Sequence, residues 1–542
     1  MFETDGDSVY VTPKTHAQVD FITQSMGGTY SKVKNHCKLP RTMGVMLELH
    51  AKLPDLKSEA AFMEEGKKLR SEMNWMLEKR KDKMILEGDR LRPYQRADAE
   101  YLISMEAAGI FNDPRTGKTP TLLEVLKGKR TKRNLIVAPA SLLWTWHMQV
   151  KNWLPEYEPV VIEGTKKAED LIDLARTHAK PTVLIVSKNS LNGLKLERFL
   201  FDLIAVDEAH YLRNYNTAQS KAVYKLKGKN RFALTGTPTV KHPSDIFGIM
   251  KFLYPKKHSS FWGWAGRYFR QAKNHFSGGN EVGDPIPERQ EEMQQEVGLV
   301  SVARKRKEVM GWLPEKDYKT IYAHMTVKQQ KYYQDMQDTF VAECLENGKE
   351  VDAINIMTQM LRLRQICIDP RLVGFTDKGC KTTTLIQWLK DREEGSRPVV
   401  IMSMFTSYLE LLRGDLEKEG YTIGEINGKM TPKKKQAAAD KFQKGEVDVL
   451  LCNTISAGTG WTLDRGDTVI FIDNAWNPAD QQQAEDRVTP TTEDVAHGHN
   501  VIHISTMNSV DDHMFEILKR KESMTDIINN GGREAVLRML GR

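Results

Sequence analysis

The chain has 542 residues, of which 40% are hydrophobic and 28% are charged, and its formal net charge is +7. This length exceeds what one hydrophobic core usually fills, so we expect two to four domains. No run of about 18 apolar residues occurs, and the acidic N-terminus has no apolar stretch, so we expect neither a membrane span nor a signal peptide. We therefore expect a cytoplasmic protein. The modest positive charge permits nucleic-acid binding without requiring it.

The five cysteines are scattered along the chain and show no CxxC or Cys/His spacing: Cys37, Cys344, Cys367, Cys380 and Cys452. Zinc sites in proteins have close ligand pairs, which this pattern lacks. We therefore interpret the cysteines as reduced thiols and expect no zinc site.

The first elements in chain order are short. Residues 1–52 form a small N-terminal accessory domain, with strand-like runs at 9–11 and 46–49 around a helical stretch. Residues 53–87 form a helical linker, because 54–85 are rich in Glu, Lys, Met and Ala and contain no run of β-branched residues.

A different pattern starts at residue 88. Short apolar runs, each flanked by turn or helix signals, predict buried parallel strands at 135–137, 183–186, 203–206 and 232–234. Residues 256–375 do not show these short apolar runs and are expected to be a mostly helical insertion. The runs return within 376–507, at 399–402, 447–451 and 469–472, and 508–542 are expected to form C-terminal helices. The predicted fold class is α/β, with a parallel-sheet lobe at 88–255, a second one at 376–507 and a small α+β domain before them.

Residues 112–119 (NDPRTGKT) end in the Gly-Lys-Thr of a phosphate-binding loop and precede a helical stretch. Backbone N–H groups at a helix start attract phosphate oxygens. Lys118 would reach the β- and γ-phosphates of a nucleotide, and the Thr119 hydroxyl would coordinate Mg²⁺. Asn112 replaces the first glycine of the usual pattern, so an ordinary glycine turn stays open as the alternative.

An acidic pair follows a buried strand about 90 residues further on, at Asp207 and Glu208. Asp207 would hold Mg²⁺ through water, and Glu208 would polarise the attacking water. Acidic residues also favour helix starts, which is the alternative reading. Because both motifs occur in order, each after a strand, ATP hydrolysis is the predicted chemistry.

Further segments resemble the Swi/Snf branch of the superfamily-two helicase-related ATPases, in particular its viral and bacterial members. The resemblance spans about residues 88–520 and rests on motifs in a fixed order: 91–96 (LRPYQR), 135–144 (LIVAPASLLW), 234–238 (LTGTP), 304–309 (RKRKEV), 361–367 (LRLRQIC), 454–463 (TISAGTGWTL), 476–478 (WNP) and 483–487 (QAEDR). It implies two RecA-like lobes that close on ATP and Mg²⁺ and advance along a DNA backbone.

The resemblance also assigns roles to residues. Gln95 would read the adenine, and the nucleotide-binding set would comprise Arg92, Gln95, Asp113, Thr116, Gly117, Lys118, Thr119, Gly460 and Arg487. Residues that couple ATP state to DNA grip would be His210, Thr235, Thr237 and Gln483. Nucleic-acid contacts would come from Pro139, Ser141, Trp144, Arg304, Lys307, Thr454, Ser456 and Trp476. Basic clusters at 127–133, 304–307 and 433–435 would add electrostatic attachment, unless they are solvated faces.

The last motif departs from the family pattern. Arg487 matches the first of two arginines, but Pro490 stands where the second is usual. Such a second arginine commonly stabilises the transferring phosphoryl group, an effect of roughly 10³–10⁵ in rate. Three hypotheses follow: Arg487 acts alone, another residue such as Arg465 replaces the missing one, or turnover is slow.

Three functions stay open on the sequence. The first is a DNA-dependent ATPase that moves on duplex or branched DNA in replication, recombination or repair. The second is a strand-separating helicase, and the third is an ATP-bound protein that clamps DNA. Residues 1–52 faintly resemble HARP-type modules, which would favour branched DNA, although a plain accessory domain is the alternative. We expect DNA as the partner, bound through its backbone with little sequence specificity, no membrane, and a monomer.

Overall fold

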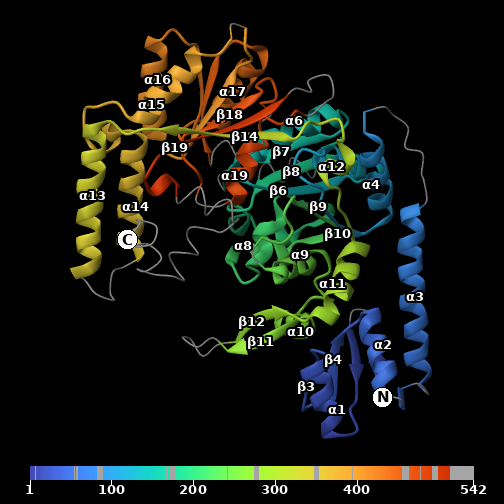
Figure 1. Cartoon of the computed structure of the whole chain (residues 1–542). Helices are drawn as coiled ribbons and strands as arrows, with labels where there is room; N and C mark the ends of the chain where they lie inside the picture. The colour runs from blue at the N-terminus through green and yellow to red at the C-terminus, as the bar shows by residue number, and fades with distance from the viewer. Residues whose placement is uncertain are drawn as a thin grey trace. The chain divides into compact units, whose positions relative to one another are not determined.

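The computed structural model describes residues 1–512 except 6–7, 54, 57–58, 82–89, 165–168, 170–171, 173–177, 241, 274–279, 347–352, 394, 455–462, 476–477 and 491–497. The chain divides into two compact units, Met1–Val309 and Met310–Arg542, which are described separately (Figure 1). C-terminal helices were expected at 508–542, and the part of this segment beyond Asp512 lies outside the described residues.

Unit 1 begins with a small α+β module, as expected. Its antiparallel sheet has the order β1-β2-β4-β3, with strands β1 (Phe2–Thr4), β2 (Ser8–Val11), β3 (Thr29–Ser31) and β4 (His36–Pro40). The strand expected at 46–49 is wrong, because these residues lie in helix α2 (Met43–Lys52). Thr42 caps that helix, and its buried residues Val45, Met46 and Leu49 recur at helical rather than strand spacing. The expected linker helix is α3 (Ala60–Lys81).

The main sheet of unit 1 has seven parallel strands in the order β13-β5-β10-β9-β6-β8-β7. In chain order they are β5 (Ala107–Ile110), β6 (Arg133–Ala138), β7 (Glu158–Ile162), β8 (Thr182–Ser187), β9 (Leu200–Val206), β10 (Lys227–Leu234) and β13 (Ser301–Val302). All four strands predicted for this region are present. Helices α4 (Pro93–Ser104), α5 (Lys118–Gly128), α6 (Leu143–Trp153), α8 (Ala218–Lys225) and α9 (Ile246–Leu253) accompany the sheet. Neighbouring parallel strands bring their carboxyl ends to one edge, which is where α/β proteins bind ligands.

The segment 256–375 contains helices, as expected, but it also forms a hairpin and contributes one edge strand to the sheet of each unit. Its helices include α10 (Phe261–Tyr268), α11 (Pro287–Leu299), α13 (Val327–Glu346) and α14 (Ala353–Ile368), but a hairpin forms from β11 (Phe269–Lys273) and β12 (Asn280–Pro285). In addition, β13 joins the edge of the unit 1 sheet and β14 (Lys316–Ala323) joins the edge of the unit 2 sheet. Edge strands carry polar residues and short apolar runs, so they lack the signal that marked the central strands.

Unit 2 contains a six-stranded parallel sheet in the order β14-β19-β18-β15-β17-β16. Besides β14, its strands are β15 (Val399–Ser403), β16 (Ile423–Ile426), β17 (Val449–Asn453), β18 (Thr468–Phe471) and β19 (His499–Thr506). The apolar residues of these strands are divided between two hydrophobic clusters. One includes residues of α15 (Cys380–Lys390) and α16 (Thr406–Lys418), and the other includes residues of α17 (Pro432–Lys444). The sheet is therefore covered on both faces (Figure 1).

Candidate active site

The phosphate-loop residues connect β5 to α5 at the carboxyl edge of the unit 1 sheet. Gly117 has φ of 88° and directly precedes α5, which begins at Lys118. An added Cβ at Gly117 would collide with the side-chain amide of Gln95, so glycine is required there by both conformation and space. The first N–H groups of α5 have no partner within the helix, which makes this turn suited to phosphate oxygens.

Two residues of α4, Tyr94 and Gln95, form hydrogen bonds to the phosphate loop. The Tyr94 hydroxyl and the Gln95 amide both donate to Thr116 O, over 2.8 Å and 2.9 Å. Gln95 Oε1 in turn accepts from Arg92 N at 2.9 Å. The structure thus places Arg92, Gln95 and Thr116 together. The contacts of Gln95 are with the loop itself, and its reading of adenine stays a prediction.

The basic segment that follows β13 also contacts the loop. Arg304 donates from Nε and Nη2 to Asp98 Oδ1 over 2.9 Å and 2.7 Å, and Asn112 Nδ2 donates to Asp98 Oδ2 over 2.9 Å. Arg306 donates its backbone N–H to Asp113 Oδ2 at 2.8 Å and its Nε to Pro114 O at 3.2 Å. Asp98 is buried on α4, and sequence reasoning missed it because nothing in its neighbourhood marks a motif. Arg304 and Arg306 therefore position the phosphate loop, whereas the exposed Lys307 lies beside them.

Lys118 points back into its own loop, where Nζ donates to Asn112 O at 2.9 Å and Asp113 O at 3.3 Å. Burial lowers the pKa of Lys118, while Glu208, Asp207 and Asp113 raise it in opposition. The ammonium group thus lies in the field of the acidic pair, as the two motifs predicted. Thr119 lies half-buried in the first turn of α5.

Asp207 directly follows β9, and its N–H donates to Val137 O of β6 at 2.8 Å. Its carboxylate accepts from Trp146 Nε1 at 2.8 Å and from Glu208 N at 2.9 Å. Burial and the charge of Glu208 raise the pKa of Asp207 to about 6, although Trp146 and Lys118 oppose this rise. Trp146 is a site residue that the sequence analysis did not identify, because its position on α6 resembles ordinary core packing.

Glu208 has a left-handed backbone, with φ of 49°, which is uncommon for a residue with a side chain. Its Oε2 lies 3.2 Å from His210 Nδ1, and the same nitrogen lies 3.3 Å from Thr235 Oγ1. Thr235 follows β10, which pairs with both β5 and β9. Its Oγ1 accepts from Thr237 N at 3.1 Å. The predicted coupling residues of unit 1 thus form one chain of contacts beside the acidic pair.

This chain of contacts reaches the phosphate loop through Gly236. A Cβ added at Gly236 would lie 2.9 Å from Pro114 Cδ, so the two backbones approach closely only with glycine present. A shift of the phosphate loop would therefore displace Thr235 and His210.

The predicted nucleic-acid residues of unit 1 follow β6 at the same edge. Pro139 precedes the short 3₁₀-helix Ala140–Leu142, which contains Ser141. Trp144 is 40% exposed, and its Nε1 donates to Glu163 Oε1 at 2.6 Å. The basic cluster 127–133 lies elsewhere, at the C-terminus of α5 and the amino end of β6.

In unit 2, several predicted site residues fall outside the described ones, namely Ser456, Gly460 and Trp476. Thr454 is buried directly after β17, and Gln483 lies half-buried in α19 (Pro478–Glu485). Arg487 is half-buried, and its carbonyl accepts from Leu463 N at 3.0 Å. The guanidinium of Arg465 lies against Gly445 at the end of α17.

A buried network at the carboxyl ends of β15 and β18 also escaped prediction. Asp473 accepts from Ser403 Oγ at 2.5 Å and from Met404 N at 3.2 Å, and Arg364 Nη2 lies 3.4 Å from it. Arg364 belongs to the 361–367 motif, one of those on which the family resemblance rests, but the sequence predicted no role for its side chain. Here it joins α14 to the sheet.

A phosphate loop after β5, an acidic pair after β9 of the same sheet and a second parallel α/β unit are features of the helicase-related ATPases. Residues 57–372 match the SNF2-related domain, and residues 380–489 match the helicase conserved C-terminal domain. The chain belongs to the SNF2-related family, which confirms the resemblance to the Swi/Snf branch.

Several relatives agree with this assignment. The chain is 24% identical to the Bacillus subtilis protein YwqA, whose name describes an ATP-dependent helicase/translocase, over 81% of this chain and 48% of that protein. It is 26% identical to the ISWI chromatin-remodeling complex ATPase CHR17 of Arabidopsis thaliana, over 73% of this chain and 38% of that one. Among solved structures, the SWI2/SNF2 ATPase core of Sulfolobus solfataricus in complex with dsDNA is 22% identical, with a TM-score of 0.40, and covers 84% of this chain and 98% of that one. The chain spans about half the length of these curated relatives, or less.

Proposed function

We propose that the chain is a DNA-dependent ATPase that moves along duplex or branched DNA. The observation that carries this proposal is the meeting of Lys118, Asp207 and Glu208 at one sheet edge, in a chain of the SNF2-related family. The names of its relatives, which include helicase/translocase and chromatin-remodeling ATPase, support the same activity.

The residues present fit a nucleotide triphosphate with Mg²⁺. Lys118 donates only to carbonyls of its own loop among the contacts described, so phosphate oxygens would replace weaker acceptors. Burial and the charge of Glu208 raise the pKa of Asp207, and a divalent cation beside this carboxylate would favour its ionised form. The described residues contain no group of three or more His, Cys, Asp or Glu side chains that could hold a metal alone. This agrees with Mg²⁺, which usually binds through one or two carboxylates plus substrate phosphates.

Each residue then has a definite task. Lys118 and the N–H groups of α5 would hold the phosphates. Thr119 and Asp207 would hold Mg²⁺, which would supply charge neutralisation on the transferring phosphoryl group. Glu208 orients and polarises the attacking water. His210 contacts both Glu208 and Thr235, and Thr235 directly follows β10, so a change at the carboxylate would be passed to the residues after β10.

DNA would be gripped through its phosphates. Pro139 and Ser141 follow β6 at the same edge as the acidic pair, and Lys307 is exposed beside the phosphate loop. Such contacts hold the backbone without reading sequence. Among the described residues no helix is long and apolar enough to cross a membrane. We place the activity in replication, recombination or repair, where branched DNA occurs.

The test is the ATPase rate of the full chain without DNA and with single-stranded, duplex, forked and four-way DNA. We expect stimulation by duplex and a stronger one by branched substrates. Lys118→Ala should abolish ATP binding, whereas Glu208→Gln should keep ATP binding and lower the rate by about 10²–10⁴-fold.

Two outcomes decide against parts of the proposal. No turnover in the wild-type protein, together with normal ATP binding, would show a DNA clamp rather than a motor. Equal stimulation by all DNA forms would remove the role on branched DNA. Triplex displacement on plain duplex, compared with strand release from forks, separates translocation from strand separation.

A further inference from the structure

Unit 1 contains a groove at the edge of its sheet that lies opposite to the phosphate loop. The groove has a volume of about 770 Å³ and is lined by residues of α2, α3, α9 and α11 and by Glu106, which directly precedes β5. Tyr254, which follows α9 and also lines the groove, donates from its hydroxyl to Ala107 O at the start of β5 over 2.6 Å. None of the described lining residues belongs to the candidate active site. The volume lies in the range of cavities that bind ligands.

Two helices form the long walls of this groove. On α3, the lining residues Leu69, Met73 and Met76 share one helical face, because they follow one another at intervals of four and three residues. On α11, the lining residues extend from Glu288 to Leu299, a length of about 16 Å at 1.5 Å per residue. The groove therefore has the length of about three helical turns.

Much of the groove surface is apolar. Met43 and Leu47 of α2 and Met250 of α9 add to the apolar residues of α3. Leu47 is 56% exposed although it is a large apolar residue. Methionine side chains adapt to the shape of a partner and are common on surfaces that bind apolar side chains. An occupant of the groove therefore needs apolar side chains of its own.

The charged residues of the groove are mostly acidic, with six glutamates and two basic residues. Three of the glutamates are already paired: Glu72 with Arg41 at 2.8 Å, Glu292 with Arg267 at 2.7 Å and Glu296 with Lys257. The other three, Glu106, Glu288 and Glu291, are exposed and form no ion pair with the described residues. Glu288 and Glu291 lie in the first half of α11, whereas Glu106 lies near its end, because β5 pairs with β13, the strand that follows α11. Both ends of the groove therefore carry uncompensated negative charge.

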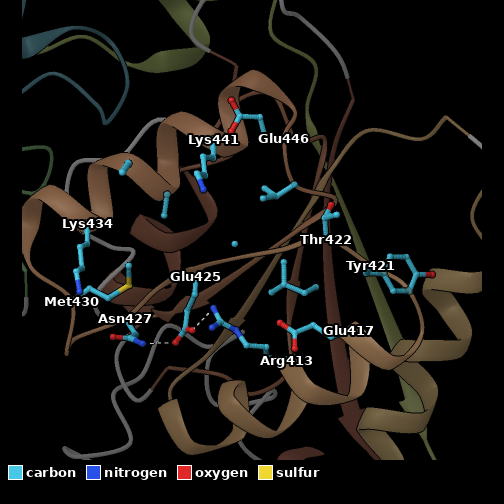
Figure 2. A pocket seen from close by; sticks show the side chains of 15 residues that line it. Arg413, Glu417, Tyr421, Thr422, Glu425, Asn427, Met430, Lys434, Lys441 and Glu446 are labelled. Carbon is cyan, nitrogen blue, oxygen red and sulfur yellow. Dashed lines mark hydrogen bonds and ion pairs between the residues drawn. The ribbon is translucent and has the colours of Figure 1, made fainter.

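The cavity along β16 in unit 2 has a similar volume, about 760 Å³, but a different balance of charge (Figure 2). Its lining combines three basic with three acidic side chains, namely Arg413, Lys434, Lys441, Glu417, Glu425 and Glu446. Arg413 Nη2 also pairs directly with Glu425 at 2.6 Å. The unit 2 cavity thus selects no charge in an occupant, whereas the unit 1 groove selects a cationic one.

We propose that the unit 1 groove binds a basic amphipathic helix of a partner protein. Its apolar side chains would pack against the methionines, and its cationic side chains would pair with Glu106 at one end and with Glu288 and Glu291 at the other. Two lysines about 11 positions apart on a helix are separated by about 16 Å, which matches the length of the groove. Apolar residues three or four positions apart between them would face the groove.

The lining also argues against other occupants. An extended segment would find no strand edge, because none of the described lining residues lies in a strand, whereas a helix satisfies its own backbone groups. The uncompensated carboxylates would repel nucleic acid, and two copies that met through this groove about a twofold axis would bring like charges together. A small apolar amine would neutralise only one end. This proposal is independent of the proposed ATPase activity.

The probe is a fluorescein-labelled 15-residue helical peptide of Ala and Gln, with lysine at its second and thirteenth positions and leucine at its sixth and ninth. A second peptide has the same composition, but its leucines lie on the opposite helical face. Fluorescence anisotropy is measured with the full chain, without nucleotide or DNA. We expect saturable binding of the first peptide and binding of the second that is weaker by roughly tenfold or more, because its leucines cannot be buried in the groove.

Matched variants test the charge and the apolar surface separately. Glu291→Lys should weaken binding roughly fivefold, because an exposed ion pair is replaced by repulsion, whereas Glu78→Lys, on α3 outside the groove, should not. Leu47→Ser should weaken binding about fivefold through lost apolar contact, whereas Leu77→Ser, 45% exposed and also outside the groove, should not. All four positions are exposed, so the circular dichroism melts should stay unchanged.

Several results would overturn the proposal. Equal losses in a variant and its control would do so, as would equal binding of the two peptides or no saturable binding at millimolar peptide. Sedimentation of the wild type as an oligomer that Glu291→Lys dissociates would replace the partner with a second copy. Complete displacement of the peptide by an equal concentration of octylamine would replace the helix with a small amine.

Discussion

The indole of Trp146 donates a 2.8 Å hydrogen bond to Oδ2 of Asp207. The tryptophan is 97% buried on α6, directly beneath the carboxylate that follows β9. This contact stabilises the ionised form of a carboxyl group whose pKa burial and Glu208 have raised to about 6. An ionised Asp207 is the form that would hold a metal cation, so the hydrogen bond from Trp146 favours the charge state that the site needs.

Trp146→Phe should shift the acid limb of the ATPase profile. In the wild type, kcat/KM should fall as pH drops through about 6, because Asp207 then takes up a proton. Removing the donor raises the pKa of Asp207 further, so the midpoint should move to higher pH, and kcat/KM near pH 7 should fall about tenfold, as expected for a lost bond to a charged group. The measurement is kcat/KM for ATP from pH 5 to 9. Trp144→Phe is the control, since Trp144 bonds to Glu163 instead and should leave the limb in place.

The central elements were readable from the sequence because their signals are local. Buried strands such as β8 show continuous apolar runs, and Lys118, Asp207 and Glu208 follow such runs within a few residues. The edge strands β7, β13, β14 and β16 were missed, since half their surface faces solvent. The interior strands β5 (AAGI) and β19 (HNVIHIST) are exceptions and were missed as well, because small or polar residues replace part of the apolar run. Met46 and Leu49 were assigned to a strand because the cap of this helix, in which Val45 N donates to the Thr42 side chain, has no equally clear sequence pattern.

The supporting contacts of the site were not readable for a related reason. Asp98 and Trp146 carry out their roles through single hydrogen bonds to partners that are distant in the chain. Arg304 of the 304–307 cluster was predicted to contact DNA, because a run of basic residues does not by itself identify its partner. Its partner, a buried carboxylate on α4, is what shows that Arg304 holds the phosphate loop.

Asp98→Asn tests that positioning role. It keeps the hydrogen bond to Asn112 sterically possible but removes the charge that holds Arg304, whose two bonds to Asp98 measure 2.9 Å and 2.7 Å. We expect a loss of about 1–3 kcal/mol in the free energy of unfolding and a raised KM for ATP, with kcat less affected. Denaturant unfolding and steady-state kinetics measure the two effects. Nucleotide-free DNA binding should not change in Asp98→Asn, whereas it should weaken in Lys307→Ala; the reverse pattern would return Arg304 to the DNA interface.

Substitutions around the last motif test which arginine completes catalysis. Arg487→Ala should lower kcat by at least about 10³-fold, the effect of losing an arginine on the transferring phosphoryl group. Arg465→Ala should leave kcat within twofold (about 0.4 kcal/mol), because its guanidinium lies against Gly445 at the end of α17. If Arg465→Ala is the slow variant, the assignments of the two arginines are exchanged.

Pro490→Arg restores the residue usual in the family, yet we expect it to be harmful. Pro490 is buried beside Thr489, which is 1% exposed and hydrogen-bonded to His499 at 3.2 Å. An arginine there would place a charge in a packed site, at a cost of about 1–3 kcal/mol or more. The expected result is a lower melting temperature without a faster ATPase, as measured by calorimetry and steady-state kinetics. A faster enzyme of unchanged stability would show that the missing arginine limits turnover.

Arg267→Met tests how the N-terminal module is fastened to the rest of unit 1. Arg267 of α10 is 1% exposed and bonds to Glu292 of α11 at 2.8 Å and 2.7 Å and to Glu48 of α2 at 3.2 Å. Removing the arginine leaves the partly buried Glu292 without its counter-charge, whereas Glu48 keeps its ion pair with Arg289 at 2.8 Å. Unit 1 should therefore lose about 3–5 kcal/mol in the free energy of unfolding. Arg270→Met is the control, because Arg270 is exposed on the neighbouring β11 and should change stability by less than about 0.5 kcal/mol. Guanidinium unfolding measures both variants, and equal stabilities would show that Arg267 does not contribute to holding the module.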